Sequence, residues 1–183
     1  MNANVSKLLN EQINKEFYSA YLQVTFIPGD AEQLSFPSGQ DLIVSCSALQ
    51  WFVSPELFFK RCNALLSGHG YFAFSTFGKE NLKEIAAVTG SGLHYYSLEE
   101  LKKSLSMHYN IVTAGEERIR LTFATPLDVL YHLKHTGVTA VCRQAWTKGD
   151  LQEFCDKYAK LFSCGNAVTL TYHPLYIIAR KKP

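Results

Sequence analysis

The sequence lacks the features of a membrane-inserted or secreted chain. No apolar run among its 183 residues approaches the ~18 residues that a membrane span needs. The first twelve residues, MNANVSKLLNEQ, are polar and do not contain the apolar core of a signal peptide. These absences predict that the chain has no membrane partner and is cytoplasmic.

A strong excess of charge of either sign is also absent. Eighteen Lys and Arg residues are nearly balanced by sixteen Asp and Glu residues, which leaves a formal net charge of +2. The longest basic run is Arg180-Lys181-Lys182, and a solvated C-terminal tail explains it. The sequence therefore gives no reason to expect a nucleic-acid partner.

The cysteines do not have the spacing of a metal site or a redox motif. None forms a C-x-x-C pair, and no histidine lies near a pair at zinc spacing. The pattern predicts free thiols and no bound metal. The five residues concerned are Cys46, Cys62, Cys142, Cys155 and Cys164.

The sequence does contain alternating helix and strand patterns, and its 47% hydrophobic content suits one buried core. Ser97 with Glu100 predicts a capping box, and Thr125 before Pro126 predicts a second helix start. Such alternation favours a mainly parallel sheet covered by helices on both faces. The predicted helices cover residues 3–19, 54–66, 97–108, 125–136 and 147–163, and the predicted strands cover 24–27, 42–45, 70–78, 109–124 and 167–181.

Small and polar residues follow the early strands. Asp30 follows the first strand after a Pro-Gly break, and Cys46 with Ser47 follows the second. Ligands of parallel sheets bind at the carboxyl ends of the strands, so these residues are expected on one rim of a nucleotide-type pocket. A glycine-rich loop normally precedes such a rim, but this sequence has no glycine before Gly29.

Residues 29–51, GDAEQLSFPSGQDLIVSCSALQW, resemble the segments after the third and fourth strands of class I S-adenosylmethionine-dependent methyltransferases. The resemblance implies S-adenosylmethionine as the methyl donor and no metal. It also implies that Asp30 and Ala31 contact the adenine end of the cofactor. Cys46 and Ser47 would then line its methionine end.

Three segments are similar to the BioC family, the malonyl-[acyl-carrier protein] O-methyltransferases of biotin synthesis. These segments are ALQWFVSPELFFKRCNALLSGHGYFAFSTFGKENLKEI, which contains the signature FSTFG, then TPLDVLYHLKHTGV and LTYHPLYIIARK. The resemblance implies methyl transfer to the free carboxylate of a malonyl thioester on acyl-carrier protein, which would be the partner. An inactive remnant, or a carrier-protein-binding module that needs a second chain to bind cofactor, remains the alternative.

In that superfamily the usual strand order is 3-2-1-4-5-7-6. By comparison, this chain is expected to be α/β, a Rossmann-like sheet with helices on both faces. It would lack the first two strands and the glycine-rich loop, and would carry a helical lid before the last strand. We expect one N-terminally incomplete domain over residues 1–183, with a cofactor-side core over 1–97 and the last strands and lid over 98–183. Residues 42–45 would then form an exposed apolar edge through which chains could associate.

The proposed reaction needs no general base, because a carboxylate is already ionised at neutral pH. We therefore assign no catalytic residue. Cations and hydroxyl donors in the lid could hold the malonyl group, and we select Tyr131, Lys134 and Arg143 as substrate-binding candidates. Trp51 could form a pocket wall or pack in the core. Tyr95 and Tyr96 could line an acyl channel, although a hydrophobic staple at the helix start explains Tyr96 without a function.

Overall fold

The computed structural model describes residues 25–138 and 146–183. The chain divides into two compact units, residues 1–37 and 38–183, and each is described separately. The predicted division into regions 1–97 and 98–183 stays a prediction. Arg143 and the predicted helix over 3–19 lie outside the described residues.

In the first unit the described residues 25–37 form turns and no strand. The strand predicted over 24–27 is therefore wrong for its described residues, 25–27. The turn centres on Asp30, whose carbonyl accepts hydrogen bonds from the backbone N–H groups of Gln33 at 2.9 Å and Leu34 at 2.8 Å. The Asp30 carboxylate accepts a third bond from the backbone of Glu32 at 2.9 Å. An aspartate that satisfies its own turn explains why the chain reverses here rather than extending.

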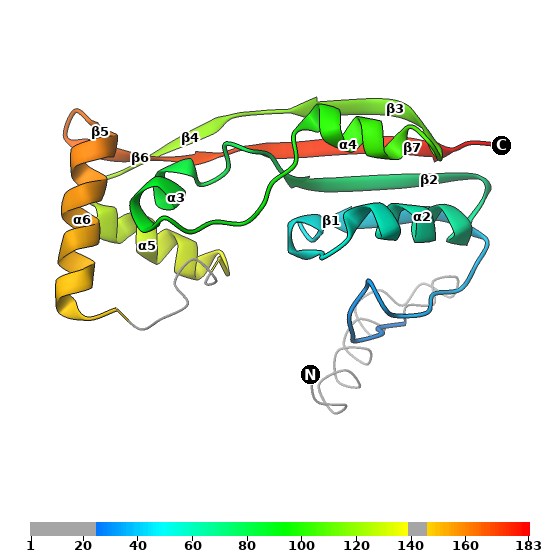
Figure 1. Ribbon diagram of the computed structural model, residues 1–183, viewed down its shortest axis with the longest axis horizontal. Helices are drawn as coiled ribbons and strands as arrows, with labels where there is room; N and C mark the ends of the chain where they lie inside the picture. The colour runs from blue at the N-terminus through cyan, green and yellow to red at the C-terminus, as the bar shows by residue number, and fades with distance from the viewer. Residues whose placement is uncertain (1–24, 139–145) are drawn as a thin grey trace, which may run out of the picture. The chain divides into compact units, whose positions relative to one another are not determined.

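The second unit contains a four-stranded sheet in the order β1-β2-β7-β3 (Figure 1). The strands are β1 (Gln40–Cys46), β2 (Leu66–Phe77), β3 (Tyr109–Glu116) and β7 (Pro174–Lys181). β1 and β2 are parallel, whereas β7 runs antiparallel to both of its neighbours. This order agrees with the 4-5-7-6 half of the expected superfamily sheet.

An aromatic core fixes the helices on one face of this sheet. Helix α2 (Pro55–Leu65) buries Phe59 against Phe72 and Phe74, with ring centroids 5.9 and 5.6 Å apart. The Tyr109 hydroxyl of β3 donates to the Phe59 carbonyl at 2.8 Å. The short η1 (Leu49–Trp51) precedes α2, and α4 (Leu98–Leu105) contacts β3. Full burial of each such aromatic ring stabilises the fold by about 2–3 kcal/mol.

The opposite face of the sheet is exposed in the described residues. Register places Leu42, Tyr71 and Arg180 in one row across this face, and Val44, Ala73 and Ile178 in the next row. Leu42 and Val44 are 56% and 58% exposed. The predicted exposed apolar strand is therefore present at the β1 edge.

A lid is inserted between β3 and β7, as predicted, but it is not purely helical. It contains its own sheet, ordered β4-β6-β5, from β4 (Ile119–Phe123), β5 (Ser163–Cys164) and β6 (Ala167–Tyr172). Each of the long strands predicted over 109–124 and 167–181 is thus two strands in different sheets. The lid helices α5 (Pro126–His135) and α6 (Lys148–Phe162) were predicted from the sequence. Helix α3 (Lys83–Thr89), which lies between β2 and α4 in the chain, was not predicted.

The lid helices and β6 share one apolar core, to which α3 contributes. α6 buries Phe154 and Tyr158, whereas Leu161 near its end is 58% exposed. The Tyr158 hydroxyl donates to the Thr169 carbonyl of β6 at 2.7 Å. The cluster consists of Leu82, Ile85, Val129, Leu133, Phe154, Tyr158, Val168 and Leu170.

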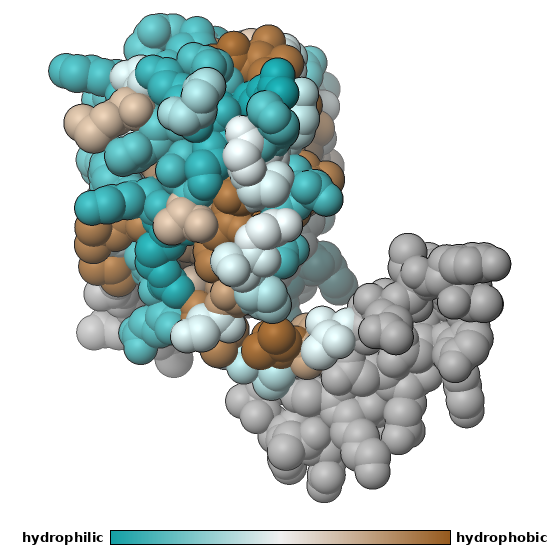
Figure 2. Space-filling view, turned by 90° about the vertical axis from the view of Figure 1, so that its right-hand side faces the viewer, coloured by the Kyte–Doolittle hydropathy of each residue, from teal (hydrophilic) through white to brown (hydrophobic). Residues whose placement is uncertain are grey.

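None of the helices in the described ranges combines the length and the apolar character that a bilayer span requires. On the face drawn in Figure 2, hydrophilic side chains predominate and hydrophobic ones form separate patches. Scattered exposed apolar side chains of this kind are ordinary on folded proteins.

Candidate functional site

The backbone makes a tight turn at the carboxyl end of β1. Ser47 has a φ of 50°, a left-handed conformation that is uncommon for a residue other than glycine. Its N–H donates to the Ser75 carbonyl at 3.0 Å and lies 3.2 Å from the Ser75 hydroxyl oxygen. The Gln50 amide donates to the Ser47 carbonyl at 2.6 Å. These bonds offset the strain of order 1–3 kcal/mol that such a conformation costs, and they fix the turn at the strand end.

A cavity of about 410 Å³ is lined in part by Trp51, which follows β1, and by Lys79, which follows β2. Trp51 forms one wall, and apolar side chains from α3 and the preceding residue form another. Pockets for small ligands commonly have this size and this mixture of apolar walls with a few polar groups. The lining residues include Trp51, Lys79, Asn81, Leu82, Ile85 and Tyr95.

Asn81 and Tyr95 form the polar wall of the cavity. Asn81 is only 5% exposed, and its amide nitrogen donates to the Tyr95 hydroxyl oxygen at 3.1 Å. Its carbonyl oxygen accepts from the backbone N–H of His173 at 3.2 Å. Burial raises the pKa of the Tyr95 hydroxyl, so this group is protonated at neutral pH.

Lys79 places a cation at the cavity. Its ammonium nitrogen lies 2.7 Å from a carboxylate oxygen of Glu100, and both side chains are about half exposed. Hydrogen bonds from Lys79 and from the Ser97 backbone and hydroxyl lower the pKa of Glu100 to about 2. Glu100 is also the third residue of the α4 capping box, so one carboxylate joins the helix start to the cavity cation.

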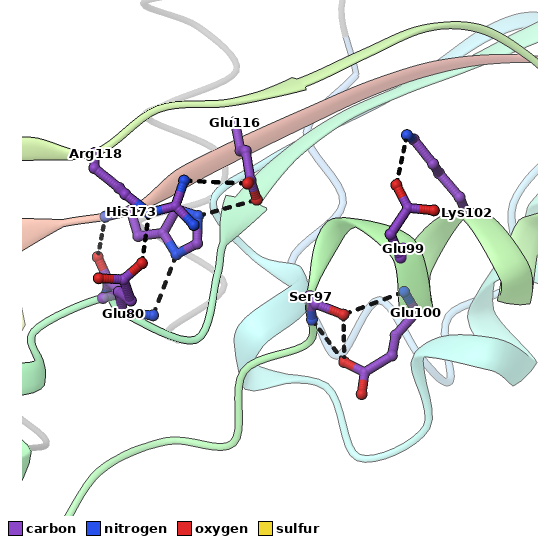
Figure 3. Close-up of polar contacts among 9 residues, drawn as sticks. Glu80, Ser97, Glu99, Glu100, Lys102, Glu116, Arg118 and His173 are labelled. Atoms are coloured by element: carbon purple, nitrogen blue, oxygen red, sulfur yellow. Dashed lines mark hydrogen bonds and ion pairs between the residues drawn. The ribbon is translucent and has the colours of Figure 1, made fainter.

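A polar network joins the two sheets where β6 gives way to β7 (Figure 3). His173 is 3% exposed, and its Nδ1 accepts the backbone N–H of Glu80 at 3.2 Å. The proton of the neutral ring is therefore on Nε2, which donates to Glu116 at 3.1 Å. Arg118 bonds to both Glu116 and Glu80. Hydrogen bonds from Arg118 and then Lys83 lower the pKa of Glu80 to about 2.

The structure separates the predicted cofactor residues into two units. Cys46 and Ser47 lie at the β1 end in the second unit, and neither lines the cavity. Asp30 and Ala31 belong to the first unit. The roles of these four residues stay predictions.

The predicted substrate residues do not line the cavity. Tyr131 on α5 is 60% exposed, and Lys134 is an exposed residue on the same helix. Neither contributes to the cavity wall, and their roles stay predictions. Lys79 and Asn81 line the cavity but were not predicted as site residues. They belong to the segment GKEN, which directly follows the carboxyl end of β2, and this position is a signal that could have identified them. No group of three or more His, Cys, Asp or Glu side chains within 25–138 and 146–183 could hold a metal ion.

Comparison with known proteins gives close relatives. A family model described as a methyltransferase domain matches residues 1–74. A malonyl-[acyl-carrier protein] O-methyltransferase of Bacteroides thetaiotaomicron is 56% identical over 170 residues, covering 87% of this chain and 65% of the relative. The Haemophilus influenzae enzyme of the same name is 42% identical, covering 85% of this chain and 60% of the relative.

Solved structures give the same fold at low sequence identity. The chain is similar to a putative methyltransferase of Bacillus halodurans, with a TM-score of 0.65 and 16% identity over all of this chain and 81% of that one. It is also similar to the YcgJ protein of Bacillus subtilis, with a TM-score of 0.58 and 14% identity over all of this chain and 80% of that one. The chain therefore has a class I methyltransferase fold and belongs to the family of the malonyl-[acyl-carrier protein] O-methyltransferases, spanning less than two thirds of the length of the relatives it matches.

Proposed function

We propose that this chain takes part in S-adenosylmethionine-dependent methyl transfer to the free carboxylate of malonyl-acyl-carrier protein in biotin synthesis. The observation that carries the proposal is the high identity to enzymes of that name over most of this chain. The cavity beside the carboxyl ends of β1 and β2 supports it, because open α/β sheets bind their ligands there. The cytoplasmic location expected from the sequence belongs to the same proposal.

The small residues at the β1 end support placing the methionine part of S-adenosylmethionine there. Cys46 is exposed, Ser47 forms a left-handed turn, and neither residue has a bulky side chain. When bound, S-adenosylmethionine supplies an electrophilic methyl group. Cys46 and Ser47 would hold its methionine end, and Asp30 and Ala31 would hold its adenine end.

The residues of this chain then have a positioning task. The malonyl carboxylate is ionised without help, so the protein must hold it in line with the methyl donor and exclude water. Leu82 and Ile85 provide apolar walls, and Lys79 provides a positive charge for an anionic substrate. Tyr131, Lys134 and Arg143 remain candidates for contacts with the malonyl group or with the acidic carrier protein.

Transfer of a labelled methyl group from S-adenosylmethionine to malonyl-carrier protein tests this proposal. The assay compares the chain alone with a chimera that adds the part of the Bacteroides thetaiotaomicron relative that the chain does not cover. We expect transfer by the chimera to malonyl-carrier protein and none to acetyl-carrier protein, which has no free carboxylate. A folded chimera that binds S-adenosylmethionine but methylates neither carrier protein contradicts the proposal.

A further inference from the structure

A relay of hydrogen bonds ends at the cavity on the hydroxyl of Tyr95. It begins at the backbone N–H of His173, which donates to the Asn81 carbonyl oxygen, and continues from the Asn81 amide nitrogen to the Tyr95 oxygen. Because a backbone N–H can only donate, the Asn81 side chain has one possible orientation. Its amide nitrogen can therefore only donate to Tyr95.

The hydroxyl hydrogen of Tyr95 is left for another acceptor. A phenol oxygen that accepts a bond from Asn81 still has one hydrogen to donate. Among residues 25–138 and 146–183, no side chain or carbonyl takes that hydrogen within hydrogen-bond distance. Tyr95 also forms part of the cavity wall. The Tyr95 hydroxyl is half-buried, is held in place by the bond from Asn81 and has no acceptor among these residues. It is therefore suited to donate to a ligand oxygen.

We propose that Tyr95 donates this hydrogen bond to the malonyl carboxylate, to the oxygen that does not receive the methyl group. The inference rests on the proposed function and names a specificity-determining residue for it. Asn81 is then a positioning residue that aims the Tyr95 hydroxyl. Since burial disfavours the phenolate, Tyr95 is a donor throughout the neutral range and does not act as a base.

The contact distinguishes a malonyl group from an uncharged acyl group. A hydrogen bond to a charged oxygen is stronger than one to a neutral oxygen, and an acetyl thioester offers no carboxylate at all. Loss of one such bond is expected to weaken malonyl binding by about 10-fold to 100-fold. Acetyl thioester binding is expected to change by less than about threefold, because the phenyl ring remains.

Calorimetric binding of malonyl-pantetheine and acetyl-pantetheine to the full chain tests the inference without methyl transfer. The variant is Tyr95→Phe. Tyr176→Phe is the matched control, since it removes a hydroxyl from a 51% exposed tyrosine of β7 that does not line the cavity. We expect only Tyr95→Phe to lose the preference for malonyl-pantetheine. Equal binding of the two thioesters by the unmodified chain overturns the inference, as does an unchanged preference in Tyr95→Phe.

The same variants in the chimera separate this inference from the proposed function. A chimera that methylates malonyl-carrier protein with the same KM whether residue 95 is Tyr or Phe overturns only the role of Tyr95. A chimera without methyl transfer contradicts the proposed function, even where the thioester preference and its dependence on Tyr95 persist. Circular dichroism and thermal melting confirm that each variant is folded before binding is measured.

Discussion

At the scale of single residues, the charged groups around His173 determine how the junction of the two sheets responds to acid. Glu80 accepts hydrogen bonds from Arg118 and Lys83, and Glu116 accepts them from Arg118 and His173. Desolvation opposes the shift at Glu116, but the hydrogen bonds outweigh it and lower its pKa. Both carboxylates are thus ionised in the folded chain at pH values where unfolded carboxylates begin to protonate.

This arrangement predicts an acid-dependent effect of Glu80→Gln on stability. The folded pKa of Glu80 is about 2, against an ordinary value of 4.5, so its stabilising effect is complete above about pH 4.5. The effect is lost as the pH falls towards 2. The difference in melting temperature between the unmodified chain and Glu80→Gln should therefore shrink across that range. Glu117→Gln, at a neighbouring exposed position, controls for the loss of one charge. A difference that does not vary with pH contradicts the assignment.

The cysteines predict a pattern of reactivity. Burial raises the pKa of the Cys62 thiol to about 12, whereas Cys46 and Cys164 are exposed. Because the thiolate is the reactive species, a neutral alkylating reagent at pH 7.5 should modify Cys46 and Cys164 well before Cys62. Peptide mass mapping of the folded chain measures this order. Labelling in denaturant, where the three should react alike, is the control, and early native labelling of Cys62 is the contrary result.

At the scale of elements, three of the helices in the described part of the chain begin with a complete capping box. The pairs are Ser97 with Glu100, Thr125 with Asp128, and Thr147 with Asp150. Each pair satisfies two backbone N–H groups that a helix start leaves without partners. The helices of the lid therefore have defined starting points that depend on four consecutive residues each.

We expect Thr147→Ala to destabilise the chain by about 1 kcal/mol, because the first turn of α6 loses a side-chain acceptor. Urea denaturation measures the change in the free energy of unfolding. Thr147→Ser keeps the hydroxyl and should cost little. Equal stability of the Ala and Ser variants would show that the Thr147 hydroxyl contributes nothing to α6.

The β1 edge predicts self-association of the chain. Within the described residues β1 pairs only with β2, and an exposed apolar edge is a template for pairing with a second copy. Val44→Lys should shift the chain towards the monomer, since a lysine on an edge strand opposes such pairing. Sedimentation velocity over a range of concentrations measures this. Val53→Lys, at a 91% exposed valine outside any strand, is the control. A chain that is monomeric at every concentration refutes the expectation.

At the scale of the whole molecule, local signals predicted elements and nonlocal contacts decided how they are arranged. Ser97 and Thr125 start helices as predicted, because a capping box is complete within four residues. The break at His173 was not predicted as a boundary between sheets, since it depends on Glu80 and Glu116, which are distant in sequence. For the same reason Tyr131 was selected as a substrate-binding candidate and Tyr95 was not, whereas of the two only Tyr95 lines the cavity.

The position of β7 has a consequence for the order of events during synthesis. β7 follows β2 and β3 in the sequence, yet it lies between them in the sheet and pairs with both along most of its length. During synthesis β2 and β3 leave the ribosome before β7 does. The strand that pairs with both of them is missing until residues 174–181 emerge. The sheet is therefore completed only after β7 has been synthesised, through contacts between residues about a hundred positions apart, which is a slow kind of folding step. A nonsense codon before Pro174 would remove the centre of this sheet rather than its margin.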